Sequence, residues 1–168
     1  FHVTKDGESF ILVNHLGMTG AWFVVNDILE ITEETFRKHI HAIFTLTSGE
    51  LLVYSDIRRF GELRFINEIA DHAPLLKMAP EPFDEQACDF FLAQSEKPRF
   101  AKKAIKEVIM DGQVISGCGN IYATESLFKM SIHPAKPTSE VSRERKIELF
   151  QVICDVLQES IDSGGSTI

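Results

Sequence analysis

The sequence lacks long apolar runs: its uninterrupted apolar stretches end after about five residues, far short of the ~20 that a membrane-spanning helix needs. It is also poor in cysteine. Cys88, Cys118 and Cys154 are an odd number at wide spacing, which fits neither a disulfide framework nor a C-x-x-C zinc half-site. We therefore expect a soluble protein in a reducing, cytoplasmic setting. No signal segment opens the chain, yet it begins at Phe1 instead of methionine, so we expect a fragment whose start lies upstream.

Basic residues are also scarce, with 17 Lys and Arg against 25 Asp and Glu and a net charge of −8. Taken alone, this balance argues against nucleic-acid binding, because phosphate binding depends on Lys and Arg displacing counterions. The distribution is uneven, however. Residues 97–106 hold five positive side chains and no acid, and residues 57–64 hold three arginines around one glutamate. These two basic segments are either solvated faces or phosphate-binding surfaces.

The first 70 of the 168 residues alternate between apolar and polar, which is typical of strands in an antiparallel sheet. Residues 42–47 alternate, Ser48-Gly49 supplies a turn, and residues 51–54 continue as the second strand of a hairpin. Further strands are predicted at 9–16, 21–25 and 62–66. We predict a partial antiparallel β-sandwich over residues 1–70.

The second half changes to a helical period. Residues 71–82 are punctuated by prolines and are predicted to be a linker, and residues 83–168 are predicted to be an all-α domain, so the fold class is α+β. A long helix is predicted from near Ser139 to Ser163, ending in glycines. Its apolar stripe is Leu149, Phe150, Val152, Ile153, Val156, Leu157 and Ile161. Shorter helices are predicted over 84–93, 101–110 and 121–129.

Two kinds of segment could carry chemistry. In Gly117-Cys-Gly119-Asn120, paired glycines allow close backbone approach and Asn120 can cap a helix whose free amides suit an anion; alternatively the glycines only turn the chain. Met18 and Phe60 are large apolar residues in glycine-flanked loops. With Arg58 they could form a wedge that enters a base stack, or they could be core residues beside a surface ion pair. His39 and His41, two apart on an expected strand, lack the partners of a metal site.

Together these segments resemble the bacterial formamidopyrimidine-DNA glycosylases. Six motifs occur in the family's order and spacing along essentially the whole chain: His15-Leu-Gly-Met-Thr-Gly20, Asp56-Ile-Arg-Arg-Phe-Gly61, Ala104-Ile-Lys106, Gly117-x-Gly-Asn-Ile-Tyr-Ala-x-Glu125-x-Leu-Phe128, Ile132-His-Pro134 and Gly164-Gly-Ser-Thr167. The related endonuclease VIII enzymes share the helical half but typically lack the first two motifs. The branch that acts on oxidised purines is therefore the better match.

The resemblance implies a two-lobed base-excision-repair enzyme with a β-sandwich, a helix-two-turns-helix domain and a zinc finger, and with DNA in the cleft between the lobes. The family removes 8-oxoguanine and formamidopyrimidines from double-stranded DNA by base flipping. An N-terminal proline amine forms a Schiff base, and β,δ-elimination then cuts the strand, an AP lyase activity. By resemblance we expect a monomer in the bacterial cytoplasm, at the nucleoid when bound to DNA, with no membrane partner.

Carried over by motif, the resemblance assigns three groups of residues. Met18, Arg58 and Phe60 would fill the space left by the flipped base, with Arg58 facing the orphaned cytosine. Phosphate contacts would come from His15, His39, Lys102, Lys103 and Asn120. The lesion pocket would involve Lys106, Ile121, Tyr122 and Glu125, although Glu125 could instead fix the turn by hydrogen bonding.

The departures from the family pattern limit these expectations. The proline nucleophile and the glutamate after it would lie upstream of Phe1, and the zinc finger would lie beyond Ile168. We therefore expect no catalytic residue, metal ligand or cofactor in this chain, and no activity from it alone. Gly112 stands where relatives usually carry Gln or Asn. The alternatives are a non-catalytic module that binds damaged DNA, or a structural role such as helix-two-turns-helix units have in ribosomal and topoisomerase proteins, which leaves the β-half motifs unexplained.

Overall fold

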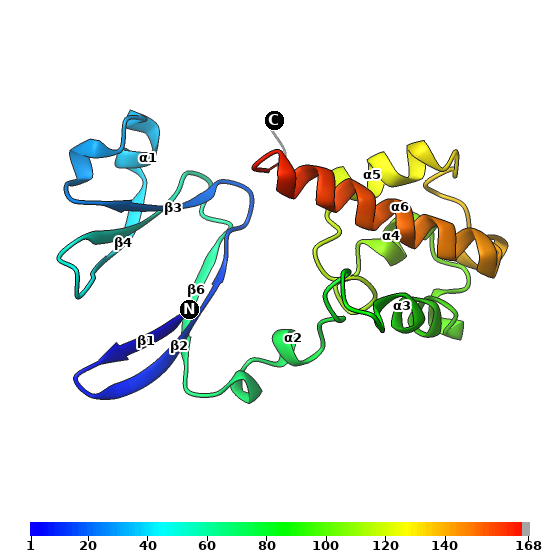
Figure 1. Ribbon diagram of the computed structural model, residues 1–168, viewed down its shortest axis with the longest axis horizontal. Helices are drawn as coiled ribbons and strands as arrows, with labels where there is room; N and C mark the ends of the chain where they lie inside the picture. The colour runs from blue at the N-terminus through cyan, green and yellow to red at the C-terminus, as the bar shows by residue number, and fades with distance from the viewer. Residues whose placement is uncertain (166–168) are drawn as a thin grey trace. The chain divides into compact units, whose positions relative to one another are not determined.

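The computed structural model describes residues 1–165 and divides into two units, Phe1–His72 and a second that begins at Ala73 (Figure 1). Unit 1 holds the strands and unit 2 the longer helices, as the predicted α+β class requires. The predicted linker, 71–82, contains the short helix α2 (Ala73–Leu76). The proposed domain boundaries themselves stay a prediction. Over the described residues, no helix is both long and apolar enough to cross a membrane.

Unit 1 contains two three-stranded antiparallel sheets (Figure 1). The first has the order β1 (His2–Lys5), β2 (Glu8–His15), β6 (Glu62–Ile66), and the second has the order β3 (Gly20–Val25), β5 (Leu51–Asp56), β4 (Ile40–Thr45). The predicted hairpin is confirmed as β4 and β5, and the three other predicted strands are β2, β3 and β6. The sequence pattern did not predict strand β1 or the short helix α1 (Glu34–Lys38).

Aromatic side chains join the two sheets face to face. The Phe1 and Trp22 ring centroids are 5.5 Å apart, and those of Phe44 and Phe65 are 6.2 Å apart, each pair bridging the two sheets. Trp22 Nε1 donates to Asn14 Oδ1 across the same interface at 2.9 Å. An apolar cavity of about 390 Å³ lies among Val3, Phe10, Phe44 and Phe65. The structure thus has the sandwich packing that the strand pattern predicts.

Unit 2 is built from α3 (Ala87–Ser95), α4 (Ile105–Ile109), α5 (Asn120–Lys129) and α6 (Arg143–Asp162) (Figure 1). Buried side chains of these helices and of the segments between them form one core, which includes Phe91, Phe100, Ile105, Val108, Leu127, Leu149 and Ile153. Short 3₁₀ turns occur in both units at Ile28–Glu30, Ile69–Asp71, Pro98–Phe100 and Thr138–Glu140.

Three details of the helix predictions are wrong. Helix α6 begins at Arg143, later than expected, because Thr138–Glu140 forms a 3₁₀ turn and Ser142 Oγ accepts the Arg145 amide at 3.3 Å. Helix α4 begins at Ile105 because Ala104, with φ −57° and ψ 134°, is not in the helical conformation. Ile161, expected in the buried stripe, is 60% exposed. The predicted glycine ending is confirmed, since Gly164 adopts a left-handed φ of +77° directly after the helix.

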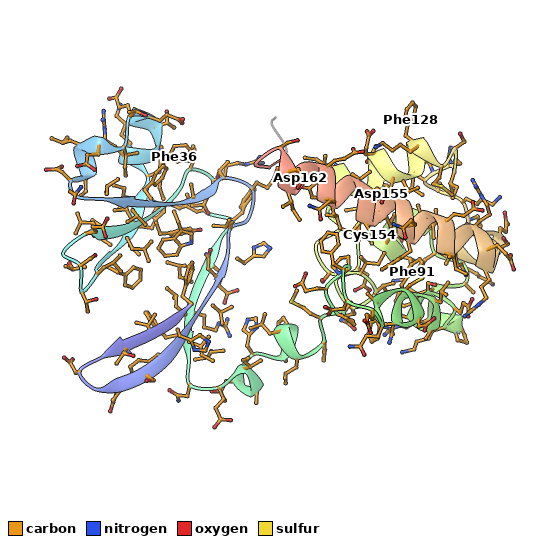
Figure 2. The ribbon with its side chains drawn as sticks, viewed as in Figure 1. Phe36, Phe91, Phe128, Cys154, Asp155 and Asp162 are labelled. Carbon is orange, nitrogen blue, oxygen red and sulfur yellow. The ribbon has the colours of Figure 1, made fainter. Side chains whose placement is uncertain are left out.

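The three cysteines are free thiols that pack at one core. Cys118 belongs to the buried cluster of unit 2, and Cys88 of α3 and Cys154 of α6 pack against it; Cys154 is labelled in Figure 2. Cys154 Sγ donates to the Pro82 carbonyl at 3.4 Å. The thiols therefore serve as small apolar groups in the packing of unit 2.

Two phenylalanines of unit 2, both labelled in Figure 2, test which contacts hold it together. Phe91 is 0% exposed and stacks on Phe150 with centroids 5.5 Å apart. We expect Phe91→Ala to lower the free energy of unfolding by about 3–5 kcal/mol, because it leaves a core cavity. Phe128, 79% exposed on α5, is the matched control, and Phe128→Ala should change that energy by less than about 0.5 kcal/mol. Urea unfolding followed by far-UV circular dichroism measures both, and equal losses would contradict the assignment.

Candidate nucleic-acid interface

Two loops at one end of unit 1 are tied together by the carboxylate of Asp56, which ends β5. The first loop, residues 16–19, joins β2 to β3, and the second, residues 57–61, joins β5 to β6. Asp56 Oδ1 accepts from Thr19 Oγ1 at 2.6 Å, and Oδ2 accepts from the Gly61 amide at 2.7 Å. The Arg58 amide donates to both Thr19 Oγ1, at 2.9 Å, and Asp56 Oδ1, at 3.2 Å. One buried carboxylate therefore fixes both loops.

These hydrogen bonds keep Asp56 ionised. The Thr19 hydroxyl lowers its pKa most, the amides of Gly61, Arg58 and Arg59 add to the effect, and burial opposes it; the resulting pKa is about 2. The Tyr54 hydroxyl, 3.5 Å from Oδ2, lies beside this charge, and burial together with the negative carboxylate raises the pKa of Tyr54. Both groups hold their usual charges at neutral pH.

Glycines allow the two loops to touch. A Cβ on Gly17, whose φ is +63°, would lie 2.7 Å from the carbonyl carbon of Phe60. A Cβ on Gly61 would lie 2.8 Å from the His15 carbonyl oxygen and would overlap the Tyr54 hydroxyl. Any larger residue at either position would force the loops apart.

The three predicted wedge residues project from this pair of loops. Met18 is 67% exposed and Phe60 59% exposed, and neither contributes to a core. The guanidinium of Arg58 lies over the Phe60 ring, 4.9 Å from its centroid, and forms no ion pair within residues 1–165. The alternative that they are core residues beside a surface ion pair does not fit this arrangement. The structure brings Met18, Arg58 and Phe60 together on adjoining loops.

One histidine of unit 1 differs from the sequence expectation. His39 is the C-cap of α1 and does not lie on a strand, and its Nδ1 donates to the Thr35 carbonyl at 2.7 Å. His41 lies on β4, and its Nε2 donates to the Asp56 carbonyl at 2.9 Å. His15 is exposed, and its Nδ1 accepts the Gly17 amide at 3.2 Å, which leaves Nε2 as a donor. Among the described residues, no three His, Cys, Asp or Glu side chains gather into a candidate metal site.

In unit 2 the start of α5 differs in one detail from the expectation. Gly119 is the N-cap, and Asn120 is the first helical residue instead of the cap. Since Gly119 has no side chain, the first-turn amides of α5 keep no side-chain acceptor, and the Asn120 side chain makes no hydrogen bond to the part of the chain described here. Gly117, with φ +76°, provides the turn into the helix. These unpaired donors can hold an anion.

A groove of about 600 Å³ lies beside this helix start. Lys106 from α4 and Asn120 from α5 line it together, with Ala104, Glu107, Met110, Pro134 and Ala135. Lys106 has no ion-pair partner among the described residues. The structure thus places one predicted lesion-pocket residue beside one predicted phosphate contact.

The other predicted residues of unit 2 are spread over the surface. Ile121 is 48% exposed on the first turn of α5. The Glu125 side chain is exposed and makes no hydrogen bond within residues 1–165, so it does not fix the turn as one expectation had it. Tyr122 is half-buried, with its hydroxyl 3.0 Å from Ser160 Oγ of α6. Lys102 and Lys103 are both exposed, and Lys103 Nζ lies 5.4 Å from the Phe100 ring centroid.

Sequence reasoning missed the role of Asp56 and Thr19, although both stand inside quoted motifs. One signal was available. An Asp two residues before a turn often accepts the amide of that turn residue, as Asp56 does from Arg58. The hydroxyl of Thr19, 37 residues away along the chain, left no local signal. Of the Gly164–Thr167 motif, the last two residues lie outside the described part of the chain.

Comparison with known proteins gives a family for both units. The model of the formamidopyrimidine-DNA glycosylase N-terminal domain matches residues 2–63, and the model of that enzyme's H2TH domain matches residues 78–168, more than half of the chain. The chain belongs to the formamidopyrimidine-DNA glycosylase family. The predicted resemblance is thereby confirmed.

Curated and solved relatives agree with this assignment. The chain is 38% identical over 167 residues to the formamidopyrimidine-DNA glycosylase of Acinetobacter baylyi, covering 99% of this chain and 59% of the relative. It is 36% identical to that of Bacillus subtilis, covering 96% and 56%. The chain thus spans less than three fifths of these relatives.

Two solved structures of the Lactococcus lactis enzyme are similar in fold. One is a G226P mutant in complex with a Fapy-dG containing DNA, with a TM-score of 0.77, 31% identity and coverage of 95% of this chain and 56% of the other. The second is the wild-type enzyme in complex with an oxidised-pyrimidine containing DNA, with a TM-score of 0.79, 29% identity and coverage of 96% and 58%. The fold of this family therefore extends over both units of the chain.

The stability of unit 1 at acid pH tests the hydrogen bonds that Asp56 accepts from the two loops. Its folded pKa, about 2, lies below the ordinary 3.8, so the stabilisation is complete above pH 4 and is lost as the pH falls toward 2. We expect Asp56→Asn to abolish this part of the pH dependence of unit 1 unfolding. Thr19→Val should shift it to higher pH, because it removes the strongest of the hydrogen bonds that lower the pKa.

The fluorescence of Trp22, the single tryptophan, reports unit 1 unfolding because its ring packs on Tyr54. Asp84→Asn, an exposed carboxylate of unit 2, is the control and should leave the acid profile of unit 1 as in the wild type. Superimposable acid profiles for the wild type and Asp56→Asn would refute the prediction.

Proposed function

We propose that this chain forms the DNA-binding part of a base-excision-repair glycosylase and AP lyase that removes oxidised purines, 8-oxoguanine and formamidopyrimidines, from double-stranded DNA. The observation that carries the proposal is the set of exposed side chains held on the two loops around Asp56: Met18, Arg58 and Phe60. The family membership of the chain and the damaged DNA in the solved relatives support it.

In this proposal the wedge replaces a base that has left the stack. Met18 and Phe60 are apolar, exposed and fixed by their loops, so they can enter between base steps without first leaving a core. Arg58 stacks on Phe60, which orients its guanidinium while its donors stay free for the unpaired base. Its donors match the acceptor edge of a cytosine that has lost its partner.

Phosphate contacts would come from both units. In unit 1, His15 offers Nε2 because the Gly17 amide occupies Nδ1, and His39 lies at the end of α1. In unit 2, the unpaired amides at the start of α5, the Asn120 side chain and the cations Lys102, Lys103 and Lys106 would hold the backbone. Ile121 and Tyr122 would border the lesion pocket, with Glu125 beside them.

The covalent chemistry of the proposed enzyme is not assigned to any residue of this chain. In that chemistry a secondary amine attacks the sugar C1′, the damaged base leaves, and an iminium forms between the amine and the sugar. β,δ-Elimination from the iminium then cuts the strand. In this proposal the chain binds and orients the DNA and acts as a monomer in the bacterial cytoplasm. It holds no cofactor, and a structural zinc would belong to the finger of the whole enzyme.

Borohydride trapping on duplex DNA with 8-oxoguanine separates this proposal from a non-catalytic module. The whole protein that contains this chain should give a covalent adduct, because borohydride reduces the iminium to a stable amine, whereas the 168 residues alone should bind without one. No adduct from the whole protein would favour the module, and an adduct from the 168 residues would contradict the assignment of the chemistry. Undamaged duplex is the control substrate.

Arg58→Ala tests the readout of the opposing base. We expect binding of the lesion duplex to lose about 1–3 kcal/mol of preference for cytosine over the other opposing bases, since one specific base contact disappears. Arg59→Ala removes the same charge from the neighbouring exposed position and should keep the preference. Fluorescence anisotropy with four duplexes that differ only in the opposing base measures both. If Arg58→Ala retains the preference of the wild type, the assigned role is wrong.

Phe60→Ala tests extrusion of the lesion. A 2-aminopurine placed next to the lesion brightens when its neighbour leaves the stack, and we expect the variant to give a smaller increase at saturation because the space is no longer filled. Phe83→Ala, which removes a phenylalanine of unit 2 that is 51% exposed, is the matched control and should leave the signal unchanged. A full signal from Phe60→Ala would count against the wedge.

A further inference from the structure

Two segments of unit 2 run side by side along the groove that contains Lys106 and Asn120. The Ile105 amide donates to the Lys136 carbonyl at 2.8 Å, and the Thr138 amide donates to the Lys103 carbonyl at 2.9 Å. An antiparallel bridge between Ala104 and Pro137 lies between these bonds. The end of the basic segment 97–106 is therefore held against the turn at 133–138.

The cations of these paired segments have no carboxylate partner. The five ion pairs among the described residues use Lys38, Arg64, Lys129, Arg143 and Arg145. None uses the cations of residues 97–106 and 133–138, which are Lys97, Arg99, Lys102, Lys103, Lys106 and Lys136. The acids nearest along the chain are Glu96, which is paired with Arg143, Glu107, which lines the groove of Lys106, and Glu140. In a protein with 25 acidic against 17 basic residues, this unpaired group indicates a ligand that supplies the negative charge.

His133 belongs to the same turn and has the geometry of His15. Its Nδ1 accepts the amide two residues ahead, that of Ala135, at 3.2 Å, as His15 Nδ1 accepts that of Gly17. The neutral ring therefore carries its proton on Nε2. His133 and Lys136 line a hollow of about 400 Å³ together with Glu140 and Arg145. Arg145 is already engaged there, since it donates to the Met130 carbonyl and to Glu148.

We infer that His133 and Lys136 form a further contact for the phosphodiester backbone of duplex DNA, next to the one at Asn120 and Lys106. Pro134 and Ala135, which lie between them in the chain, line the groove of Lys106 and Asn120, so the two sites adjoin. The inference rests on the proposed function, and it extends the DNA contact of unit 2 from the start of α5 to the turn before α6. Each residue would neutralise or hydrogen-bond a phosphate and read no base.

The salt dependence of DNA binding by the chain tests this inference. We expect Lys136→Ala to reduce the slope of log K against log salt concentration by about 0.9, because one phosphate contact is lost, and to weaken binding equally for damaged and undamaged duplex. Lys77→Ala removes an exposed lysine from outside the paired segments and is the control. It should keep the wild-type slope.

A pair of variants separates the contact of His133 from its role in the turn. In His133→Asn the side-chain oxygen can still accept the Ala135 amide, but the Nε2 donor is gone, so affinity should fall about as for Lys136→Ala. In His133→Gln the amide nitrogen restores a donor near the Nε2 position, so affinity should recover in part. If His133 only supported the turn, His133→Asn would keep more DNA affinity than His133→Gln.

The outcomes distinguish the two proposals. If the wild type shows no salt-dependent binding to lesion duplex, the proposed function fails. If it binds, but Lys136→Ala keeps the full slope and His133→Asn keeps full affinity, only the further inference is overturned.

Discussion

The arrangement of unit 1 depends on one buried carboxylate that accepts hydrogen bonds from two separate loops. Asp56 binds the hydroxyl of Thr19 and the amides of Arg58 and Gly61, so its charge is satisfied in the interior where an unpaired charge would be costly. Neither loop has regular secondary structure, and each would otherwise sample many conformations. The carboxylate replaces the missing ladder of backbone hydrogen bonds.

The proposed wedge binds more tightly if it is rigid before it meets its target, because ordering exposed side chains on binding would consume part of the binding free energy. Here the loops are ordered by contacts within unit 1. Gly17 and Gly61 permit backbone-to-backbone approach, and the Arg58 guanidinium packs over the Phe60 ring. The stacking reduces the freedom of both side chains. Phe60 and Met18 are therefore exposed on loops that contacts within unit 1 hold in place.

The sequence predicted the architecture better than the site. Alternation and helical period located β2 to β6 and the four longer helices, because those periods reflect which side chains are buried. Helix starts were less certain: Thr138–Glu140 folds as a 3₁₀ turn, and Gly119 takes the cap position expected of Asn120. Residue type and the flanking glycines predicted that Met18 and Phe60 project from loops, and their role as a wedge stays a proposal. The bond from Thr19 to Asp56 could not be predicted, because it joins residues that only the folded sheets bring together.

The burial of the thiols at the unit 2 core has a consequence for their reactivity. Burial raises the pKa of all three cysteines, that of Cys118 to about 12, and the neighbouring Asp155 adds to the effect at Cys154. Peroxides attack the thiolate and not the thiol, and at neutral pH these sulfurs remain protonated. The three thiols therefore react slowly with peroxides and remain small apolar groups in the packing of unit 2.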